Sequence, residues 1–341
     1  MVFKAVTAIL FVAAMIIGQP TLSLANSKPI TIVWYPNESA NDYVSSRNEF
    51  GRLVEQATGR KVVHRLTTDY VIAIEALASG SADIGAVMGA VGYIAAKNKN
   101  PNVNILFVNS GVSGTLEDAV YYSWLCVNKG VADNYKDGDS YSIANIQGKK
   151  ISFVSNSSTS GFRVPTGSII SFFRKTAQWE KINEDDMVEG GPQAFFTEVL
   201  FGGSHQGSAF NLISGRADIA AFCDTEMAPY ADLKEGAESR VGSVYAIKPN
   251  ATPPFNTVTG QEFVIIASIP VLNGPNAYNP QNLNPDEIAS IRKVFTSEET
   301  ANNQHFFYQP GNVGFYKKTK NERYLEVDDS WYNPIREMSN R

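Results

Sequence analysis

The feature that most constrains the fold is a phrase that occurs twice in the chain. It reads Leu-Ala-Ser-Gly-Ser-Ala-Asp-Ile over residues 77–84 and Leu-Ile-Ser-Gly-Arg-Ala-Asp-Ile over residues 212–219. Each copy fits the end of a helix, a glycine cap, and an aspartate that leads into a buried strand. The repeat indicates two similar α/β units, and therefore two lobes with a cleft between them.

Strands alternate with helices around the first copy. We expect strands over residues 30–34, 61–66, 83–88 and 103–108, and helices over residues 42–58, from 67–70 to Gly80, and over 89–97. This alternation implies a parallel sheet that is covered on both faces.

The same pattern starts again after a longer strand at residues 121–128. We expect further strands at 150–154, near 187–188, at 218–223 and at 241–247, with helices beyond Ser160 and over 206–214. A strand at 263–267 then returns the chain to the first lobe, followed by a loop at 278–284 and a helix at 285–295. We therefore predict one lobe from residues 26–122 and 255–341, and a second lobe from residues 123–254.

The N-terminal residues carry an export signal. Lys4 precedes an uncharged apolar segment at residues 5–17, and Ser23-Leu24-Ala25 fits a cleavage site, which predicts a signal peptide over residues 1–25 and a periplasmic protein. A membrane anchor is the rival interpretation, but the apolar segment is short for a span. Because the formal net charge is -5, nothing favours nucleic-acid binding.

The cysteine and histidine content gives no sign of a metal or redox site. Cys126 and Cys223 could form a disulfide in an exported protein, or could each be a small buried apolar residue. The three histidines are scattered and no CxxC motif occurs, so we expect no metal and no cofactor.

A hydroxyl-rich turn follows the predicted strand at residues 150–154. Ser157, Ser158, Thr159 and Ser160 lead through Gly161 into a helix. A helix start offers free N–H groups and the positive end of the helix dipole, and the hydroxyl groups add donors, so the turn suits an oxyanion. An ordinary Ser/Thr helix cap is the alternative.

Polar residues after the other predicted strands should face the same cleft, since it lies at the carboxyl ends of the strands. Tyr70 and Tyr93 could instead pack at a rim, and His205 could cap a helix. The acids at 224 and 226 could only complement a helix dipole. The candidate ligand-binding residues are Asn37, Glu38, Tyr70, Tyr93, Ser158, Thr159, Ser160, His205, Asp224 and Glu226.

An enzyme is disfavoured. Ser160, His205 and Asp224 include the residue types of a hydrolase triad, but no G-x-S-x-G elbow surrounds Ser160. We therefore expect no catalytic residues.

The stretch at residues 156–165 resembles the S-T-S-G-[FY]-x-x-P motif of phosphonate-type periplasmic binding proteins, the solute receptors of ABC importers. Further stretches resemble other motifs of this family in the same order along the chain. They are Asp69-Tyr70 with Glu75-Ala-Leu, Ala82-Asp-Ile with Gly89 and Tyr93, residues 122–129, Gly203-Ser-His205, Asp218-Ile-Ala-Ala, and residues 328–336.

This resemblance implies a type II periplasmic-binding fold, with two α/β lobes joined by two crossover strands and closing on a ligand. By position, Ser158, Thr159 and Ser160 would hold the oxyanion, Tyr70 and His205 would add donors, and Glu226 would match an acid that meets a ligand amine in some members.

Some positions depart from the family pattern. Met88 stands where some members have an aromatic residue, Gln206 where an acid is frequent, and Arg163 where an apolar residue is usual. Arg163 could approach the anion or point to solvent, and the Gly- and Phe-rich insert at 195–203 could reshape the cleft wall.

We expect a monomeric, non-catalytic solute-binding protein that delivers a small anionic ligand, a phosphonate or a phosphite or phosphate ester, to ABC permease subunits. The alternatives are another solute on the same fold, such as a sulfonate or organic acid, or a periplasmic sensor that reports its ligand to a signalling partner.

Overall fold

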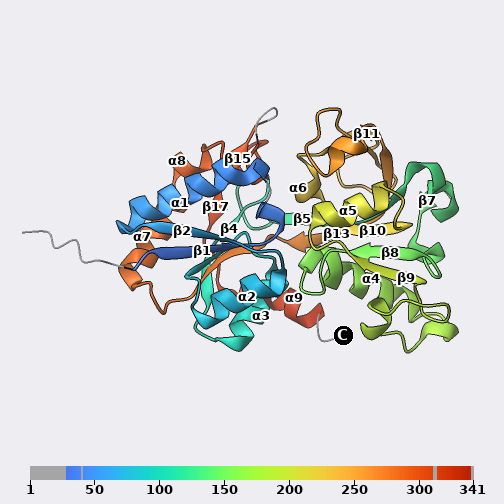
Figure 1. Ribbon diagram of the computed structural model, residues 1–341, viewed down its shortest axis with the longest axis horizontal. Coiled ribbons are helices and arrows are strands. Elements are labelled where there is room, and N and C mark those ends of the chain that lie inside the picture. Colours follow the sequence, from blue (N-terminus) through green and yellow to red (C-terminus); the bar gives the residue numbers. More distant parts are fainter. Residues whose placement is uncertain (1–27, 40, 310–312, 339–341) are drawn as a thin grey trace, which may run out of the picture.

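The computed structural model describes residues 28–39, 41–309 and 313–338 of the 341-residue chain. The expected signal peptide at residues 1–25 lies outside these described residues. The chain forms two lobes, each built around its own sheet with helices on both faces (Figure 1). In this described part, no helix combines the length and the apolar character that crossing a membrane requires.

The first lobe contains a six-stranded sheet with the order β17-β4-β14-β3-β1-β2. Helices α1 and α7 pack on one face of it, and α2 and α3 cover the other (Figure 1). The elements are β1 (Ile30–Trp34), α1 (Val44–Thr58), β2 (Val62–Leu66), α2 (Tyr70–Ser79), β3 (Ile84–Ala86), α3 (Ala90–Lys99), β4 (Asn104–Asn109), β14 (Pro275–Tyr278), α7 (Pro285–Phe295) and β17 (Tyr324–Leu325).

The second lobe contains a seven-stranded sheet with the order β11-β12-β13-β5-β10-β8-β9. Helix α4 packs on one face in a core rich in phenylalanine, and α5 and α6 lie on the other face. The elements are β5 (Val120–Asn128), β8 (Lys150–Phe153), α4 (Val164–Phe173), β9 (Glu198–Phe201), α5 (His205–Ile213), β10 (Ile219–Cys223), α6 (Asp224–Met227), β11 (Ala231–Glu235), β12 (Val244–Ile247) and β13 (Glu262–Leu272).

Two long strands, β5 and β13, carry the chain between the lobes. β5 follows β4 of the first sheet, and β13 precedes β14 of the same sheet. The two strands pair with each other in antiparallel register from Phe263 opposite Asn128 to Leu272 opposite Val120. This arrangement of two α/β lobes with two crossover strands confirms the predicted type II fold.

Short elements complete the described chain. Of these, α8, β15, β16 and α9 belong to the C-terminal segment. The short elements are β6 (Lys136–Asp137), β7 (Ser140–Tyr141), α8 (Glu298–Ala301), β15 (Phe307–Tyr308), β16 (Tyr316–Lys317) and α9 (Asn333–Met338).

Two expectations about the elements were wrong, and a strand was missed. The expected strand near residues 187–188 is absent, because Asp185–Met187 forms a 3₁₀ helix that buries the Met187 side chain in the core. One edge of that sheet is instead formed by β9, which lies inside the Gly- and Phe-rich insert and pairs in parallel with β8. The first sheet is mixed and not parallel, because β14 is inserted antiparallel between β3 and β4.

The repeated phrase has the same structure in both lobes. Gly80 and Gly215 both have a positive φ, of 73° and 77°, which only glycine adopts without strain. The carboxylate of Asp83 accepts the backbone N–H of Thr31 at 2.7 Å, and that of Asp218 accepts the N–H of Lys150 at 2.9 Å. In each lobe the aspartate therefore ties its own strand to the start of the neighbouring parallel strand.

The two aspartates differ in burial, and this difference predicts different costs of removal. Asp83 is 2% exposed and also accepts from the Asn282 amide at 2.8 Å, whereas Asp218 is exposed. Asp83→Ala leaves buried donors without a partner and should lower the free energy of unfolding by about 2–3 kcal/mol, whereas water replaces Asp218 and Asp218→Ala should cost below about 1 kcal/mol. Urea unfolding of the matched pair measures this, and equal losses would contradict it.

Candidate functional site

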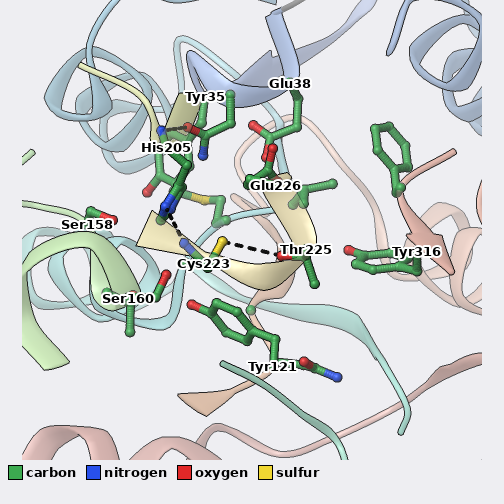
Figure 2. Close-up of a pocket in the computed structure, with 18 of the residues that line it drawn as sticks. Tyr35, Glu38, Tyr121, Ser158, Ser160, His205, Cys223, Thr225, Glu226 and Tyr316 are labelled. Atoms are coloured by element: carbon green, nitrogen blue, oxygen red, sulfur yellow. Dashed lines mark hydrogen bonds between the residues drawn. The ribbon is translucent and has the colours of Figure 1, made fainter. Parts of the chain in front are cut away.

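A cavity of about 70 Å³ lies between the two lobes (Figure 2). This volume has room for a few water molecules or one small organic ion. Its walls come from both lobes and include hydroxyl, aromatic, amide, imidazole and carboxyl groups. The lining residues are Tyr35, Asn37, Glu38, Tyr43, Tyr70, Val87, Met88, Gly89, Asn109, Tyr121, Ser158, Thr159, Ser160, His205, Cys223, Thr225, Glu226, Asn273, Gly274, Phe315 and Tyr316.

The hydroxyl turn forms one wall of this cavity, where β8 ends and the chain enters a helix. The Ser158 hydroxyl oxygen accepts the N–H of Gly161 at 3.1 Å, and residues Thr159–Arg163 form a π-helical turn that continues into α4. A Cβ atom on Gly161 would lie 2.1 Å from Val154, so the turn fits only with glycine at this position. Because the Ser158 oxygen already accepts a bond, its proton is available to a ligand.

Thr159 brings the start of a second helix, from the first lobe, to the same wall. Its hydroxyl oxygen accepts the N–H of Val91, in the first turn of α3, at 2.9 Å. A Cβ atom on Gly89 would lie 2.8 Å from that oxygen, so a side chain there would hinder this approach. The positive ends of two helix dipoles therefore face each other across the cleft, an arrangement that an anion between them stabilises.

His205 is a neutral donor at the start of α5. Its Nδ1 atom accepts the backbone N–H of Cys223 at 3.1 Å, so in the neutral ring the Nε2 atom carries the proton. Burial lowers the pKa of His205 to about 3, which keeps the ring neutral at physiological pH. The ring lines the cavity, and it contributes a donor without a positive charge.

Asn37 connects His205 with Tyr70. Its amide oxygen accepts the backbone N–H of His205 from the other lobe at 3.1 Å, and its amide nitrogen donates to the Tyr70 hydroxyl at 2.7 Å. Burial raises the pKa of Tyr70 well above its ordinary value, so the phenol stays protonated. Since the Tyr70 oxygen accepts from Asn37, its proton can be donated to a ligand.

Two carboxyl groups, on Glu38 and Glu226, stand at another part of the wall and point toward each other (Figure 2). Glu226 accepts from the Gln206 amide at 3.1 Å and from the Tyr43 hydroxyl at 3.5 Å, and Arg47 donates to the backbone oxygen of Glu38. Burial raises the pKa of Glu226 to about 7 and raises that of Glu38 well above its usual range, also because the two acids are close. The pair therefore retains at least one proton near neutral pH.

Polar contacts at the rim also join the lobes. The Asp42 carboxylate accepts the Tyr230 hydroxyl at 3.1 Å and the Thr252 hydroxyl at 2.8 Å, and Lys317 pairs with Glu238 at 2.6 Å. These contacts close the cleft as it stands in this structure. The contacts of Thr252 and Lys317 are exposed and contribute little each, whereas the Tyr230 side chain is buried.

The structure brings eight of the ten expected ligand residues to the cavity. They are Asn37, Glu38, Tyr70, Ser158, Thr159, Ser160, His205 and Glu226. The placement of the other two corrects the expectation. The Tyr93 ring is fully buried and its hydroxyl donates to Asp329 at 2.6 Å, because α3 presents it to the C-terminal segment. Asp224 turns away at the start of α6, where it accepts the N–H of Tyr122 at 2.9 Å.

The open questions about neighbouring residues are also answered. Arg163 pairs with Glu184 and does not line the cavity, whereas Met88 does line it. The insert at residues 195–203 contributes Phe195 and Phe196 to the core and no residue to the cavity wall. Cys126 and Cys223 are both free and buried; Cys126 lies opposite Ala220 in the sheet and Cys223 opposite Ser123.

Several lining residues were missed from the sequence. Tyr35 directly follows β1 and could have been found by the rule that placed Asn37 and Glu38. Tyr121 is the second residue of the crossover strand β5, where burial raises its pKa and Ser160 is a hydrogen-bond partner. Phe315 and Tyr316 come from the aromatic tail, and nothing in the local sequence there indicates a site.

Comparisons with known proteins agree with this geometry. A family model for the "ABC transporter, phosphonate, periplasmic substrate-binding protein" matches residues 32–332. The phosphate-import protein PhnD of Mycolicibacterium smegmatis is 27% identical over 242 residues, which cover 67% of this chain and 68% of that protein.

Two solved structures share the fold. A binding-protein component of an ABC phosphonate transporter from Pseudomonas aeruginosa has a TM-score of 0.61 and 20% identity, covering 92% of this chain and 86% of that one. PhnD1 from Prochlorococcus marinus, solved with methylphosphonate, has a TM-score of 0.60 and 14% identity, covering 92% of this chain and 97% of that one.

The raised pKa of Glu226 predicts how stability depends on pH. An acid whose pKa is about 7 in the folded protein, against an ordinary value of 4.5, binds its proton more tightly when folded, so stability falls as pH rises from about 4.5 to 7. Glu226→Gln should therefore be more stable than the wild type at pH 8, by up to about 3 kcal/mol, and similar to it at pH 4.5. Urea unfolding at both pH values tests this. The exposed Glu180→Gln is the control, and an unchanged pH dependence in Glu226→Gln would contradict the assignment.

Proposed function

This chain belongs to the family of periplasmic substrate-binding proteins of phosphonate ABC transporters, and we propose that it captures a small phosphonate-type oxyanion between its lobes for delivery to an import permease. Proteins of this family bind solutes and are not enzymes, and their place is the periplasm. The observation that carries the proposal is the convergence of neutral donors on one cavity, from Ser158, Thr159, Tyr70 and His205.

Neutral donors suit an anion that has to be both bound and released. Hydrogen bonds from neutral groups to a charged oxygen are strong when water is excluded, and the two helix N-termini add partial positive charge. The described residues that line the cavity include no lysine or arginine, so these residues offer no fixed ion pair that must break on release. Affinity then depends on the number and geometry of the donors, which both lobes supply together.

The acid pair is expected to select among oxyanions. A phosphonate or phosphate monoester can carry a proton near neutral pH, because its second pKa is about 6. A carboxylate oxygen of Glu226 or Glu38 can accept a hydrogen bond from that protonated oxyanion. Sulfate carries no proton at this pH and is repelled by a carboxylate. We therefore place phosphonate, phosphite and phosphate esters ahead of sulfate and sulfonates.

A second candidate is a phosphonate that also carries an ammonium group. It is favoured by the buried Glu38–Glu226 pair, whose charge no cation in the described residues that line the cavity neutralises. An ammonium group at this position would let both acids ionise, and the complex would then release a proton on binding.

The lobes are proposed to close like a hinge around the ligand. We place the first boundary near residue 122, as the sequence did, and the second boundary near the end of β13 and not at residue 255, because β13 pairs within the sheet of the second lobe. The closed shape would be the form that the permease subunits recognise, and the protein would act as a monomer. Residues 1–25 would be the export signal, removed before the protein folds in the periplasm.

Calorimetric titration against a panel of small anions tests the proposal. We expect binding of methylphosphonate, phosphite or 2-aminoethylphosphonate, and no binding of sulfate. Proton release that occurs with 2-aminoethylphosphonate alone, measured in buffers of different ionisation enthalpy, would identify the ammonium-bearing ligand class. Binding only of sulfonates or organic acids would overturn the proposal, as would a failure to bind any member of the panel.

Alanine variants of two neighbouring serines test whether the hydroxyl turn binds the anion or is only an ordinary helix cap. Ser158→Ala removes a buried donor to the anion and should weaken phosphonate binding by about 10- to 100-fold, since a hydrogen bond to a charged group is worth about 1.5–3 kcal/mol. Ser157 is in the same turn but does not line the cavity, so Ser157→Ala should bind as the wild type does. Equal affinities of the two variants would show that the turn only caps the helix and does not bind the anion.

A further inference from the structure

A second and larger cavity, of about 510 Å³, adjoins the first. It lies between the first part of α6, strands β11 and β12, and the C-terminal segment of the first lobe. Its volume is within the range of about 300–1,000 Å³ that is usual for small-molecule sites. The first cavity has a volume of about 70 Å³, and a small anion that fits inside it does not require the space of the second cavity.

The two cavities meet at two side chains. Thr225 and Phe315 line both of them, one from each lobe. Thr225 stands beside Cys223 at the edge of the first cavity (Figure 2), and Asp224, the residue before it, lines the second. An organic group attached to an anion in the first cavity could therefore extend past Thr225 into the second.

The second cavity has the walls of a ligand site and is not a plain solvent gap. Four aromatic side chains line it, from Trp124, Tyr245, Tyr308 and Phe315. The Trp124 side chain is 2% exposed, and its Nε1 donor has no hydrogen-bond partner among the described residues. A buried donor without a partner is costly, and a ligand acceptor or a water molecule would satisfy it.

Asp224 offers an acceptor in the wall of this cavity. The two lysines in its wall are already paired, Lys317 with Glu238 and Lys248 with Asp232. Asp224 has no ion-pair partner in the part of the chain that the structure describes. Its Oδ1 atom accepts two backbone N–H groups, from Tyr122 and Thr225, whereas Oδ2 receives only the Ser239 hydroxyl, at 3.3 Å. A donor group on a ligand could bind this oxygen.

On the basis of these contacts, and resting on the proposed function, we propose that the natural ligand is a phosphonate or phosphate monoester with a large, flat organic group. The oxyanion occupies the first cavity, and the organic group passes Thr225 and Phe315 to lie among the aromatic side chains of the second. A hydrogen-bond donor on that group faces Asp224. Asp224, a candidate ligand-binding residue from the sequence, would thus contact the organic group of the ligand and not its oxyanion.

Titration with three phosphonates tests this inference: methylphosphonate, which needs only the first cavity, benzylphosphonate, and 4-aminobenzylphosphonate. Burial of the ring should make benzylphosphonate bind at least about tenfold more tightly than methylphosphonate. The amino group of 4-aminobenzylphosphonate should strengthen binding further.

The variant Leu233→Trp places a bulky side chain in the second cavity, which Leu233 lines, and not in the first. It should lower the affinity for benzylphosphonate at least about tenfold and leave methylphosphonate binding unchanged. Val131→Trp, at an exposed position outside both cavities, is the matched control and should bind all three ligands as the wild type does.

The outcomes separate this inference from the proposed function. Binding of methylphosphonate together with weaker or absent binding of both benzyl compounds would overturn the extended ligand and leave the proposed function intact. Equal losses for methylphosphonate and benzylphosphonate in Leu233→Trp would also overturn it. Binding of none of the three would overturn both.

Discussion

The closed cleft depends on the contact between two helix starts. Thr159, in the first turn of one helix, accepts the N–H of Val91, in the first turn of the other. Facing dipole ends of equal sign repel each other, so this contact is favourable only with oxygen atoms between them. The Thr159 hydroxyl supplies one such atom, and a bound oxyanion would supply more. Binding of the anion would therefore also stabilise the closed arrangement of the two lobes, through the same electrostatic interaction.

The site around this contact divides its chemistry between the lobes. The second lobe contributes the hydroxyl turn and the imidazole of His205, and the first contributes Tyr70 and the Asn37 amide, which bonds to His205 from across the cleft. Neither lobe alone surrounds an anion. Because the shared groups are short side chains on helix starts, small errors in lobe position would remove several donors together, which couples affinity to the shape of the closed state.

The sequence alone was informative where chemistry depends on neighbours in the chain. The hydroxyl turn, the caps at Gly80 and Gly215 and the aspartates that follow them are local patterns, and the structure has each at its expected place. It was uninformative where placement depends on distant packing. Tyr93 was expected at the cleft from its distance along α3, but the direction of that helix gives its hydroxyl to Asp329. Phe315 and Tyr316 reach the cavity because the C-terminal segment folds back across the first lobe, which no local pattern encodes. Strand β9 was missed because its position at the sheet edge depends on pairing with β8.

The rim contacts at Asp42 have a consequence for transport. Asp42 holds Tyr230 and Thr252 of the opposite lobe, so it favours the closed shape whether or not a ligand is inside. A stronger latch would tighten binding, because less free energy would be spent on closing. It would also close the protein when it is empty, and an empty closed receptor would compete with loaded ones for the permease. The Thr252 contact at this rim is exposed and therefore weak. Such a contact permits closure without enforcing it, so that the closed state is stabilised mainly when a ligand is bound.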